Sequence, residues 1–189
     1  FAVGPGVLIP RPETELLVER AIEMIDRLWP NERVQILDLC TGSGAIALSL
    51  ALECAPAEGA HAHPHHQERV TVTGSDISPA ALSFARTNRA SFGLTDRVAL
   101  VEGDLLFWTG GPWDVILTNP PYLRPDQIDG NTEIAAEPRV ALDGGIGGIE
   151  LIERILDQAV TRVAPRFGML IELDPDHAGA VRALAAARF

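Results

Sequence analysis

Short runs of apolar residues alternate along this chain with segments whose apolar residues recur at helical spacing. The runs are rich in Val, Ile and Leu and end in turn residues, which predicts strands separated by helices. The expected strands are residues 34–40, 69–75, 98–101, 114–118 and 167–173. The expected helices that follow them are residues 45–53, 80–90, 149–163 and 178–187. This alternation indicates an α/β fold with a doubly wound, mostly parallel sheet.

A further helix is expected ahead of the first strand. Pro12 fits the first turn of a helix, and the pattern continues as far as Trp29. The apolar face of this helix is formed by Leu17, Ala21, Met24, Ile25 and Leu28. We therefore predict a front segment and helix, residues 1–30, that packs on a main domain formed by residues 31–189.

A polar, irregular stretch, residues 123–143, is too long for a simple connection and predicts a lid over a binding site. Glu137 and Arg139 could order this lid by pairing with each other or with the front segment, although a surface pair would contribute little. Three residues of the front segment would either close over a ligand or cap and charge-balance the first helix: Arg11, Glu13 and Thr14.

Length and composition narrow the class of protein. At 189 residues and 47% apolar, the chain suits one well-buried domain. It contains no uninterrupted apolar run of roughly 18 residues, so a membrane span is not expected. No signal-peptide pattern follows Phe1, although an excised segment ahead of Phe1 could carry one. Cys40 and Cys54 do not suggest a disulfide framework, which favours a reducing, cytoplasmic setting.

The charge of the chain bears on its partners. The net charge is −11, and all 15 basic residues are Arg. Phosphate neutralisation drives most nucleic-acid affinity, and this chain has no basic run to supply it. A duplex-DNA substrate is therefore disfavoured.

The most informative pattern follows the fourth expected strand. Asn119-Pro120-Pro121-Tyr122 stands directly after an apolar run, so it lies at the strand's carboxyl end, where open α/β sheets bind ligands. The side chain of Asn119 and the prolines offer carbonyl acceptors without a competing proline N–H, and Tyr122 offers a flat ring. We interpret all four residues as a substrate pocket for a planar NH₂, an amide or a base amino group. Asn119, Pro120 and Tyr122 are the expected catalytic residues.

A glycine-rich turn joins the first expected strand to the next helix. In Asp38-Leu-Cys-Thr-Gly-Ser-Gly44 the two glycines let the backbone approach a ligand, and the helix start offers N–H groups to a phosphate or a carboxylate. The turn lacks the full dinucleotide fingerprint, because Cys40 occupies the place of the first glycine. The same residues also suit a plain tight turn.

Acidic residues end the next two strands. Asp76 is placed to accept hydrogen bonds from both ribose hydroxyls, although it could instead cap the next helix, a role that Ser78 fits better. Asp104 could receive an adenine amino group, although alone it would be an ordinary turn residue. With the glycine turn and the tetrapeptide, these residues predict an S-adenosylmethionine site beside the NH₂ pocket. The expected cofactor-binding residues are Cys40, Thr41, Gly42, Ser43, Gly44, Asp76, Asp104, Leu105 and Asn119.

Other candidate chemistry is weaker. Four histidines crowd one stretch after the first βα unit (His61, His63, His65 and His66), but no Cys or carboxylate constellation accompanies them. We expect a solvated insertion there and no metal site. His177 fits a helix start better than a general base. Cys40 is not expected to act as a nucleophile, because no histidine stands near it in any motif.

With these residues in hand, the chain resembles the release-factor glutamine methyltransferases, the PrmC/HemK family, over nearly all its length. The tetrapeptide is shared with enzymes that methylate adenine or guanine amines, whereas an Arg-Pro-Glu-Thr-Glu and a Glu-Pro-Arg-x-Ala-Leu segment point to glutamine. The resemblance is carried by residues 8–15, 38–44, 76–78, 81–82, 88, 103–104, 119–122 and 137–142. Ribosomal-protein glutamine methyltransferases are close relatives, but their front segment looks less like residues 11–15.

The resemblance implies a Rossmann-like domain that uses S-adenosylmethionine to methylate the glutamine of a Gly-Gly-Gln loop in a peptide-chain release factor. It also implies a helical domain ahead of Phe1 and two further strands beyond Phe189, so we expect a chain truncated at both ends. A cytoplasmic location is expected, with no membrane partner and no direct nucleic-acid partner.

Four residues depart from the family pattern: Cys40 replaces a usual Gly, Gly147 a usual Asp, and Asp174 and His177 a usual Gly and Gln. The Cβ of Cys40 would crowd the methionine portion of the cofactor. Two alternative functions remain open. One is a nucleic-acid amino-methyltransferase acting on a flipped adenine or guanine. The other is a cofactor-binding module without turnover, which Cys40, Gly147 and the missing ends would favour.

Overall fold

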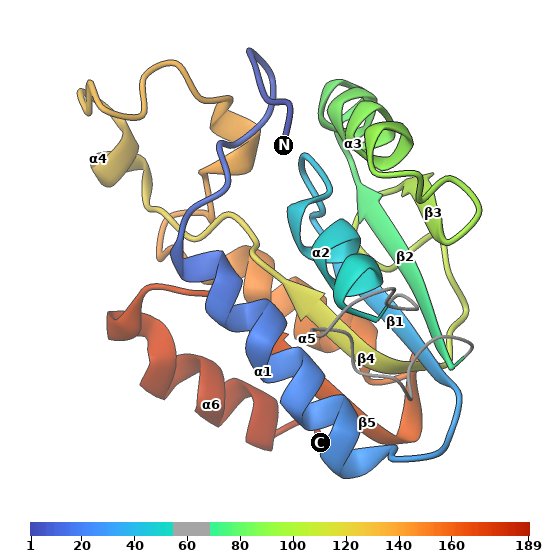
Figure 1. Cartoon of the computed structure of the whole chain (residues 1–189). Helices are drawn as coiled ribbons and strands as arrows, with labels where there is room; N and C mark the ends of the chain where they lie inside the picture. The colour runs from blue at the N-terminus through green and yellow to red at the C-terminus, as the bar shows by residue number, and fades with distance from the viewer. Residues whose placement is uncertain (55–68) are drawn as a thin grey trace.

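Five parallel strands form the centre of the structure, in the order β3-β2-β1-β4-β5 (Figure 1). A computed structural model describes residues 1–54 and 69–189, so the expected histidine cluster lies outside the described residues. The strands are β1 (Val34–Leu39), β2 (Val70–Asp76), β3 (Val98–Glu102), β4 (Trp113–Thr118) and β5 (Val163–Ile171). The expected α/β fold with a parallel sheet is confirmed.

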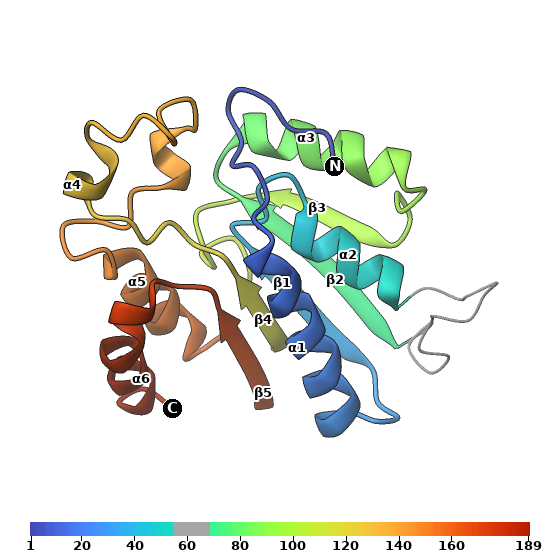
Figure 2. The ribbon, with the colours of Figure 1, turned by 60° about the vertical axis from the view of Figure 1, so that its left-hand side comes forward.

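Helices cover both faces of this sheet, as Figures 1 and 2 show. One face carries α1 (Glu13–Leu28), α2 (Ala45–Glu53) and α3 (Pro79–Ser91), and the other carries α5 (Glu150–Ala159) and α6 (Ala178–Ala186). A short α4 (Pro125–Ile128) and two 3₁₀ turns (Arg139–Ala141 and Pro175–His177) lie in the connections. None of the described helices has the length and hydropathy of a membrane span.

The inner strands β1 and β4 are buried over most of their length, which explains their largely apolar sequence. In β1, Ile36 packs in the cluster formed with α1 and α2, whereas Leu37 packs in the cluster formed with α5. In β4, Leu117 packs in the cluster with α1 and α2, and Ile116 packs in the cluster with α5. Successive side chains of a strand point to opposite faces, which explains this alternation. The two clusters hold the helices against the sheet.

Ile116 offers a test of this packing. Its side chain is fully buried between the sheet and α5. Ile116→Val should lower the free energy of unfolding by about 1 kcal/mol, because it removes one methylene and leaves a small void. Urea unfolding measures the change. Ile146, which is 87% exposed, provides the matched control, and Ile146→Val should stay within about 0.5 kcal/mol of wild type. Equal effects at both positions would contradict this packing.

Two expected boundaries were wrong. The helix expected over residues 149–163 ends at Ala159, and the strand expected over residues 167–173 begins at Val163. The apolar spacing of the helix runs on through Val163, but this residue pairs with Trp113 of β4, and the Trp113 N–H donates to the Arg162 carbonyl (2.8 Å). Sheet pairing therefore overrides the local helical pattern there.

The parallel register places the strand ends together. Leu39 of β1 aligns with Ser75 of β2 and with Thr118 of β4. The residues that follow these strands therefore share one edge of the sheet. The order reverses between β1 and β4, and such a switch point is where open α/β sheets bind ligands. In Figure 1 the chain ahead of α1 crosses this edge from the N-terminus beside α3, where the Ala2 N–H donates to the Asn88 side chain (2.6 Å).

Candidate active site

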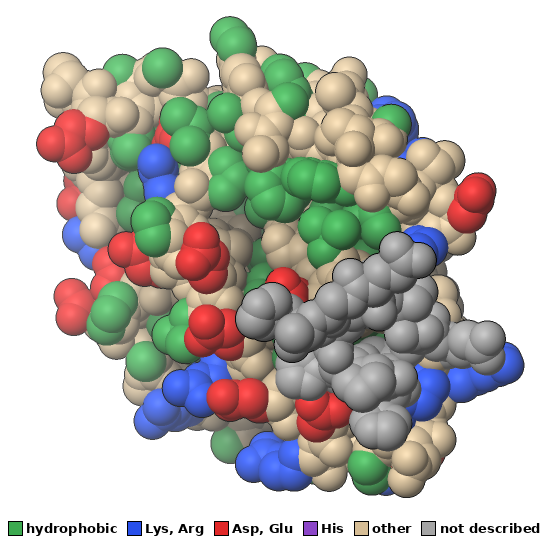
Figure 3. Space-filling view, in the orientation of Figure 1, with side chains coloured by type: hydrophobic (Ala, Val, Ile, Leu, Met, Phe, Trp, Pro, Cys, Tyr) green, Lys and Arg blue, Asp and Glu red, His purple; other side chains and the backbone are tan. Residues whose placement is uncertain are grey.

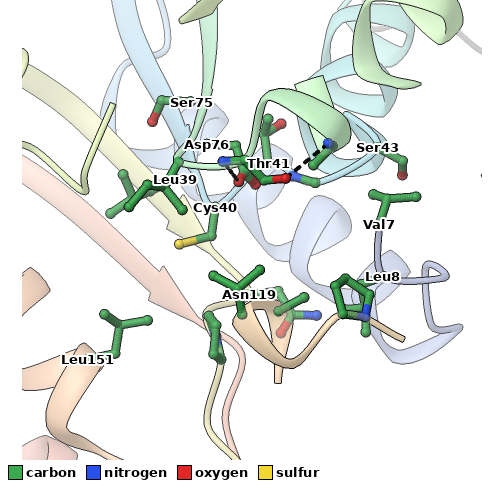
Figure 4. A pocket seen from close by; sticks show the side chains of 18 of the residues that line it. Val7, Leu8, Leu39, Cys40, Thr41, Ser43, Ser75, Asp76, Asn119 and Leu151 are labelled. Atoms are coloured by element: carbon green, nitrogen blue, oxygen red, sulfur yellow. Dashed lines mark hydrogen bonds between the residues drawn. The ribbon is translucent and has the colours of Figure 1, made fainter. Parts of the chain in front are cut away.

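A cavity of about 510 Å³ opens at the carboxyl edge of the sheet (Figure 4). Its volume lies in the range of roughly 300–1,000 Å³ that is usual for small-molecule sites. It is lined by the turn after β1, the ends of β2 and β3, Asn119, the front segment and residues 138–141. A smaller cavity of about 100 Å³ adjoins it, and Asn119 and Pro121 belong to the walls of both.

Most of the expected cofactor residues meet in the larger cavity. Its wall contains Cys40, Thr41, Gly42, Ser43, Asp76, Asp104, Leu105 and Asn119. Gly44 is not part of the wall; it precedes α2 at a φ of +85°, where a Cβ would lie 3.0 Å from Leu48 Cδ1. Glycine is therefore suited to this position by backbone conformation and packing rather than by ligand contact.

The turn after β1 is anchored from below by Asp38. This carboxyl group is fully buried and does not line the cavity. Its Oδ2 accepts hydrogen bonds from the Thr41 hydroxyl (2.5 Å) and the Ala47 N–H (2.9 Å). Burial raises the pKa of Asp38 to about 7, while these two bonds oppose the shift. Asp38 therefore fixes the shape of the turn.

Asp76 lies in the cavity wall and also holds the turn after β1 by a hydrogen bond. Its Oδ2 accepts from the Gly42 N–H (2.9 Å), a bond drawn in Figure 4, and its Oδ1 accepts from the Ser78 N–H (2.8 Å). Each carboxylate oxygen keeps a further lone pair for a ligand hydroxyl. Burial raises the pKa of Asp76. Ser78 accepts from the Ala81 N–H (3.2 Å), which confirms that Ser78 caps α3.

Asp104 and Cys40 also line the larger cavity, but each has a feature that the sequence did not predict. Asp104 follows β3 in the wall, but its carboxylate pairs with Arg154 of α5 (3.0 Å). Cys40 adopts a φ of +61°, in the left-handed region that glycine favours, and Figure 4 shows its side chain on the side of the turn that faces Asn119. Burial raises the pKa of the Cys40 thiol, which disfavours the reactive thiolate form.

The tetrapeptide separates the two cavities. Pro120 and Tyr122 line only the smaller one, with Leu8, Ile134 and other apolar residues around them. Burial raises the pKa of the Tyr122 phenol, and nearby carboxylates add to the shift. The four residues expected to bind a substrate therefore meet in one small, largely apolar pocket.

Asn119 makes contacts that the sequence did not predict. Its Nδ2 donates to Glu172 Oε1 (2.7 Å) and lies 3.3 Å from Thr14 Oγ1. Glu172 directly follows β5, as Asp76 ends β2 and Asp104 follows β3. An acidic residue at the carboxyl end of a strand was the sequence signal that could have identified Glu172. It was missed because the expected strand ran to residue 173 and placed Glu172 inside it.

The front segment and the expected lid are joined by an ion pair. Arg11 Nη2 lies 2.9 and 2.8 Å from the two carboxylate oxygens of Glu137, whose side chain is only 6% exposed. Arg139 pairs instead with Asp129 and Asp143 inside the same stretch. Of the two pairings expected for Glu137, the one with the front segment is confirmed.

The other front-segment residues separate in role. Thr14 is buried in the wall of the larger cavity, whereas Glu13 is exposed in the first turn of α1 and lines neither cavity. His177 occupies the expected helix start before α6. Residues 1–54 and 69–189 contain no group of His, Cys, Asp and Glu that could hold a metal ion.

The surface charge agrees with the acidic composition. On the face shown in Figure 3, the Arg side chains lie mainly along the lower edge and the right-hand side, and Asp and Glu side chains are interspersed toward the left.

Comparison with known proteins gives a consistent result. The family model described as "RMKL-like, methyltransferase domain" (UPF0020) matches residues 19–161. A release factor glutamine methyltransferase of Moorella thermoacetica is 40% identical over 99% of this chain, and a ribosomal protein uL3 glutamine methyltransferase of Bradyrhizobium diazoefficiens is 35% identical over 92%. The chain spans 61% and 52% of the length of these relatives.

A solved structure shows the same fold. The ribosomal protein L11 methylase of Lactobacillus delbrueckii subsp. bulgaricus matches 97% of this chain and 72% of its own, with a TM-score of 0.64 and 18% identity. At this identity the similarity supports the architecture alone.

Proposed function

We infer the function of this chain from one premise: it belongs to the UPF0020 family of RMKL-like methyltransferase domains. We propose that it transfers a methyl group from S-adenosylmethionine to the side-chain amide nitrogen of a glutamine in a peptide-chain release factor. The observation that carries this proposal is the position of Asn119, in the wall of both the larger cavity and the small apolar pocket. The names of several relatives support the substrate.

The residues of the larger cavity fit S-adenosylmethionine. Asp76 keeps carboxylate lone pairs for the ribose hydroxyls. The turn offers the backbone N–H of Ser43 to a carboxylate, because the Gly42 N–H already donates to Asp76. Ile77, 52% exposed beside Asp76, gives an apolar surface for a base. When bound, this cofactor supplies a methyl group carried on a sulfonium.

The tetrapeptide can activate a poor nucleophile without a base. An amide nitrogen reacts weakly because its lone pair is delocalised into the carbonyl. In the proposed complex, Asn119 Oδ1 and the Pro120 carbonyl accept the two amide N–H bonds and orient the nitrogen toward the larger cavity. The same oxygens stabilise the positive charge that grows on the nitrogen during transfer. Tyr122 covers the amide plane and excludes water, and the proton leaves after transfer.

Glu137 should matter for binding rather than for chemistry, because it holds the front segment against the stretch that lines both cavities. Glu137→Gln should lower kcat/KM for the release factor by about tenfold, mainly through KM, since a buried charged partner is lost. Steady-state kinetics measure the change. Asp126→Asn removes an exposed pair with Arg124 in the same stretch and should have little effect. A change confined to kcat would contradict this role.

Methyl transfer from labelled S-adenosylmethionine tests the proposed function. The acceptors are a purified release factor, its Gly-Gly-Gln variant with the glutamine replaced by alanine, single-stranded DNA and single-stranded RNA. Label on the wild-type factor alone is the expected result. Label on nucleic acid alone would assign the chain to the nucleic-acid amino-methyltransferases. Cofactor binding without label on any acceptor would favour a module without turnover or the need for a further docking domain. The proposal includes a cytoplasmic location, where release factors act.

A further inference from the structure

We propose that Glu172, together with Thr14, positions Asn119 so that its side-chain oxygen, and not its NH₂ group, faces the methyl acceptor. Glu172 lines neither cavity, so it acts through Asn119 and is a positioning residue. The inference deepens the proposed function and rests on it for its kinetic consequences. The orientation of the Asn119 side-chain amide can be tested without reference to the acceptor.

The orientation follows from the hydrogen-bond chemistry of three side chains. An ionised carboxylate only accepts hydrogen bonds, so the group of Asn119 that lies 2.7 Å from Glu172 Oε1 must be the NH₂. The Thr14 hydroxyl donates to Glu172 Oε2 (2.9 Å), which leaves its oxygen lone pairs for the second N–H of Asn119 (3.3 Å). The three side chains form a closed ring in which every donor meets an acceptor.

This ring leaves Asn119 Oδ1 without a hydrogen-bond donor among the described residues. The oxygen is therefore available to a ligand in the adjoining pocket. Turning the amide by 180° would set Oδ1 against the carboxylate of Glu172 and lose the charge-assisted bond. An asparagine alone is nearly symmetric in shape and could present either group, so the neighbouring carboxylate decides which one the acceptor meets.

The ring is held by three parts of the chain that lie far apart in sequence. Thr14 is buried in the first turn of α1, Asn119 follows β4, and Glu172 follows β5. Glu172 continues the sheet, because its N–H donates to the Thr118 carbonyl (3.0 Å). Rigid support of this kind sets a catalytic dipole before the substrate arrives, so little reorganisation is needed during the reaction.

Protonation of Glu172 should release the constraint. Burial raises the pKa of this carboxyl group, and the charge of Glu13 on α1 adds to the shift, whereas the bonds from Thr14 and Asn119 oppose it. The phenol of Tyr122 is a further titratable group close enough to Glu172 to interact with its charge. A protonated Glu172 gains a donor and can accommodate Asn119 in either orientation. The rate of transfer should therefore fall as the pH falls through the pKa of Glu172.

Two readouts on the full chain test the inference, with Glu172→Gln as the variant. Glutamine keeps the shape but adds an NH₂ donor, so it allows Asn119 to turn. By NMR, the side-chain NH₂ of Asn119 should exchange at least about tenfold more slowly in wild type than that of the exposed Asn31, and lose this protection in the variant. Rapid exchange in wild type, or protection that persists in the variant, would overturn the inference whatever the acceptor is.

Kinetics with the release factor give the second readout. In Glu172→Gln, kcat should fall by about 10- to 100-fold with KM and cofactor affinity within about twofold, and the acidic limb of the pH profile should disappear. Thr14→Val should lower kcat in the same direction. Glu13→Gln removes a nearby charge without touching Asn119, so it should retain the wild-type kcat above the acidic limb. It should shift that limb to lower pH, because the charge of Glu13 raises the pKa of Glu172. Unchanged kcat in Glu172→Gln beside an active wild type would overturn the inference, whereas an inactive wild type would reject the proposed function and leave the NMR result to decide.

Discussion

Replacing Asn119 by alanine should lower the rate of methyl transfer by about 10²–10³-fold, equivalent to roughly 3–4 kcal/mol of lost transition-state stabilisation. The side chain holds an oxygen acceptor at the boundary of the two cavities, where the positive charge would develop. A fixed dipole in a water-excluded pocket acts without reorganisation, so its loss falls on the transition state. Single-turnover transfer to a release factor measures the rate of the chemical step. In steady-state kinetics the loss should appear in kcat rather than in KM.

Cofactor binding should survive this substitution, because the turn after β1 and Asp76 remain in place. Titration calorimetry with S-adenosylhomocysteine, the cofactor without its methyl group, measures that affinity. Asn31 lies exposed before β1 and provides the matched control, so Asn31→Ala should leave both quantities unchanged. Wild-type turnover in Asn119→Ala would remove the tetrapeptide from the mechanism.

Replacing Asp76 by alanine should weaken cofactor affinity by roughly 10²-fold. In the proposed cofactor complex, two charge-assisted hydrogen bonds to the ribose hydroxyls would contribute roughly 1.5 kcal/mol each, and their loss would leave those hydroxyls poorly paired. The carboxylate also holds the Gly42 N–H (2.9 Å), so the turn itself should loosen. Asp76→Asn keeps the shape and one acceptor oxygen, and we expect an intermediate affinity.

The same calorimetric titration with S-adenosylhomocysteine measures this change. Asp96 is exposed between α3 and β3, so Asp96→Asn removes an equal charge far from the cavity and should not alter the affinity. An unchanged affinity in Asp76→Ala would show that the glycine turn binds the cofactor without the carboxylate.

The elements of the fold were largely predictable because their signals are local. The spacing of apolar residues identified the five strands and the helices that cover them, and most boundaries agree within one or two residues. The exceptions lie around Val163. The apolar spacing there continues that of the preceding helix, but Val163 belongs to β5 because it pairs with Trp113 of β4. Pairing between distant strands leaves no local mark, so sequence spacing could not place that boundary.

Much of the candidate site was predictable for a related reason. Cys40, Asp76 and Asn119 each stand at the carboxyl end of a strand, and a parallel sheet brings such ends to one edge. The sequence by itself determined the parallel α/β architecture and the polar residues at that edge, because both follow from short-range pattern and spacing. Tertiary structure alone decided that Thr14 and Glu172 meet Asn119 and that Arg11 meets Glu137, since side chains from separate elements become neighbours only when the helices and strands pack.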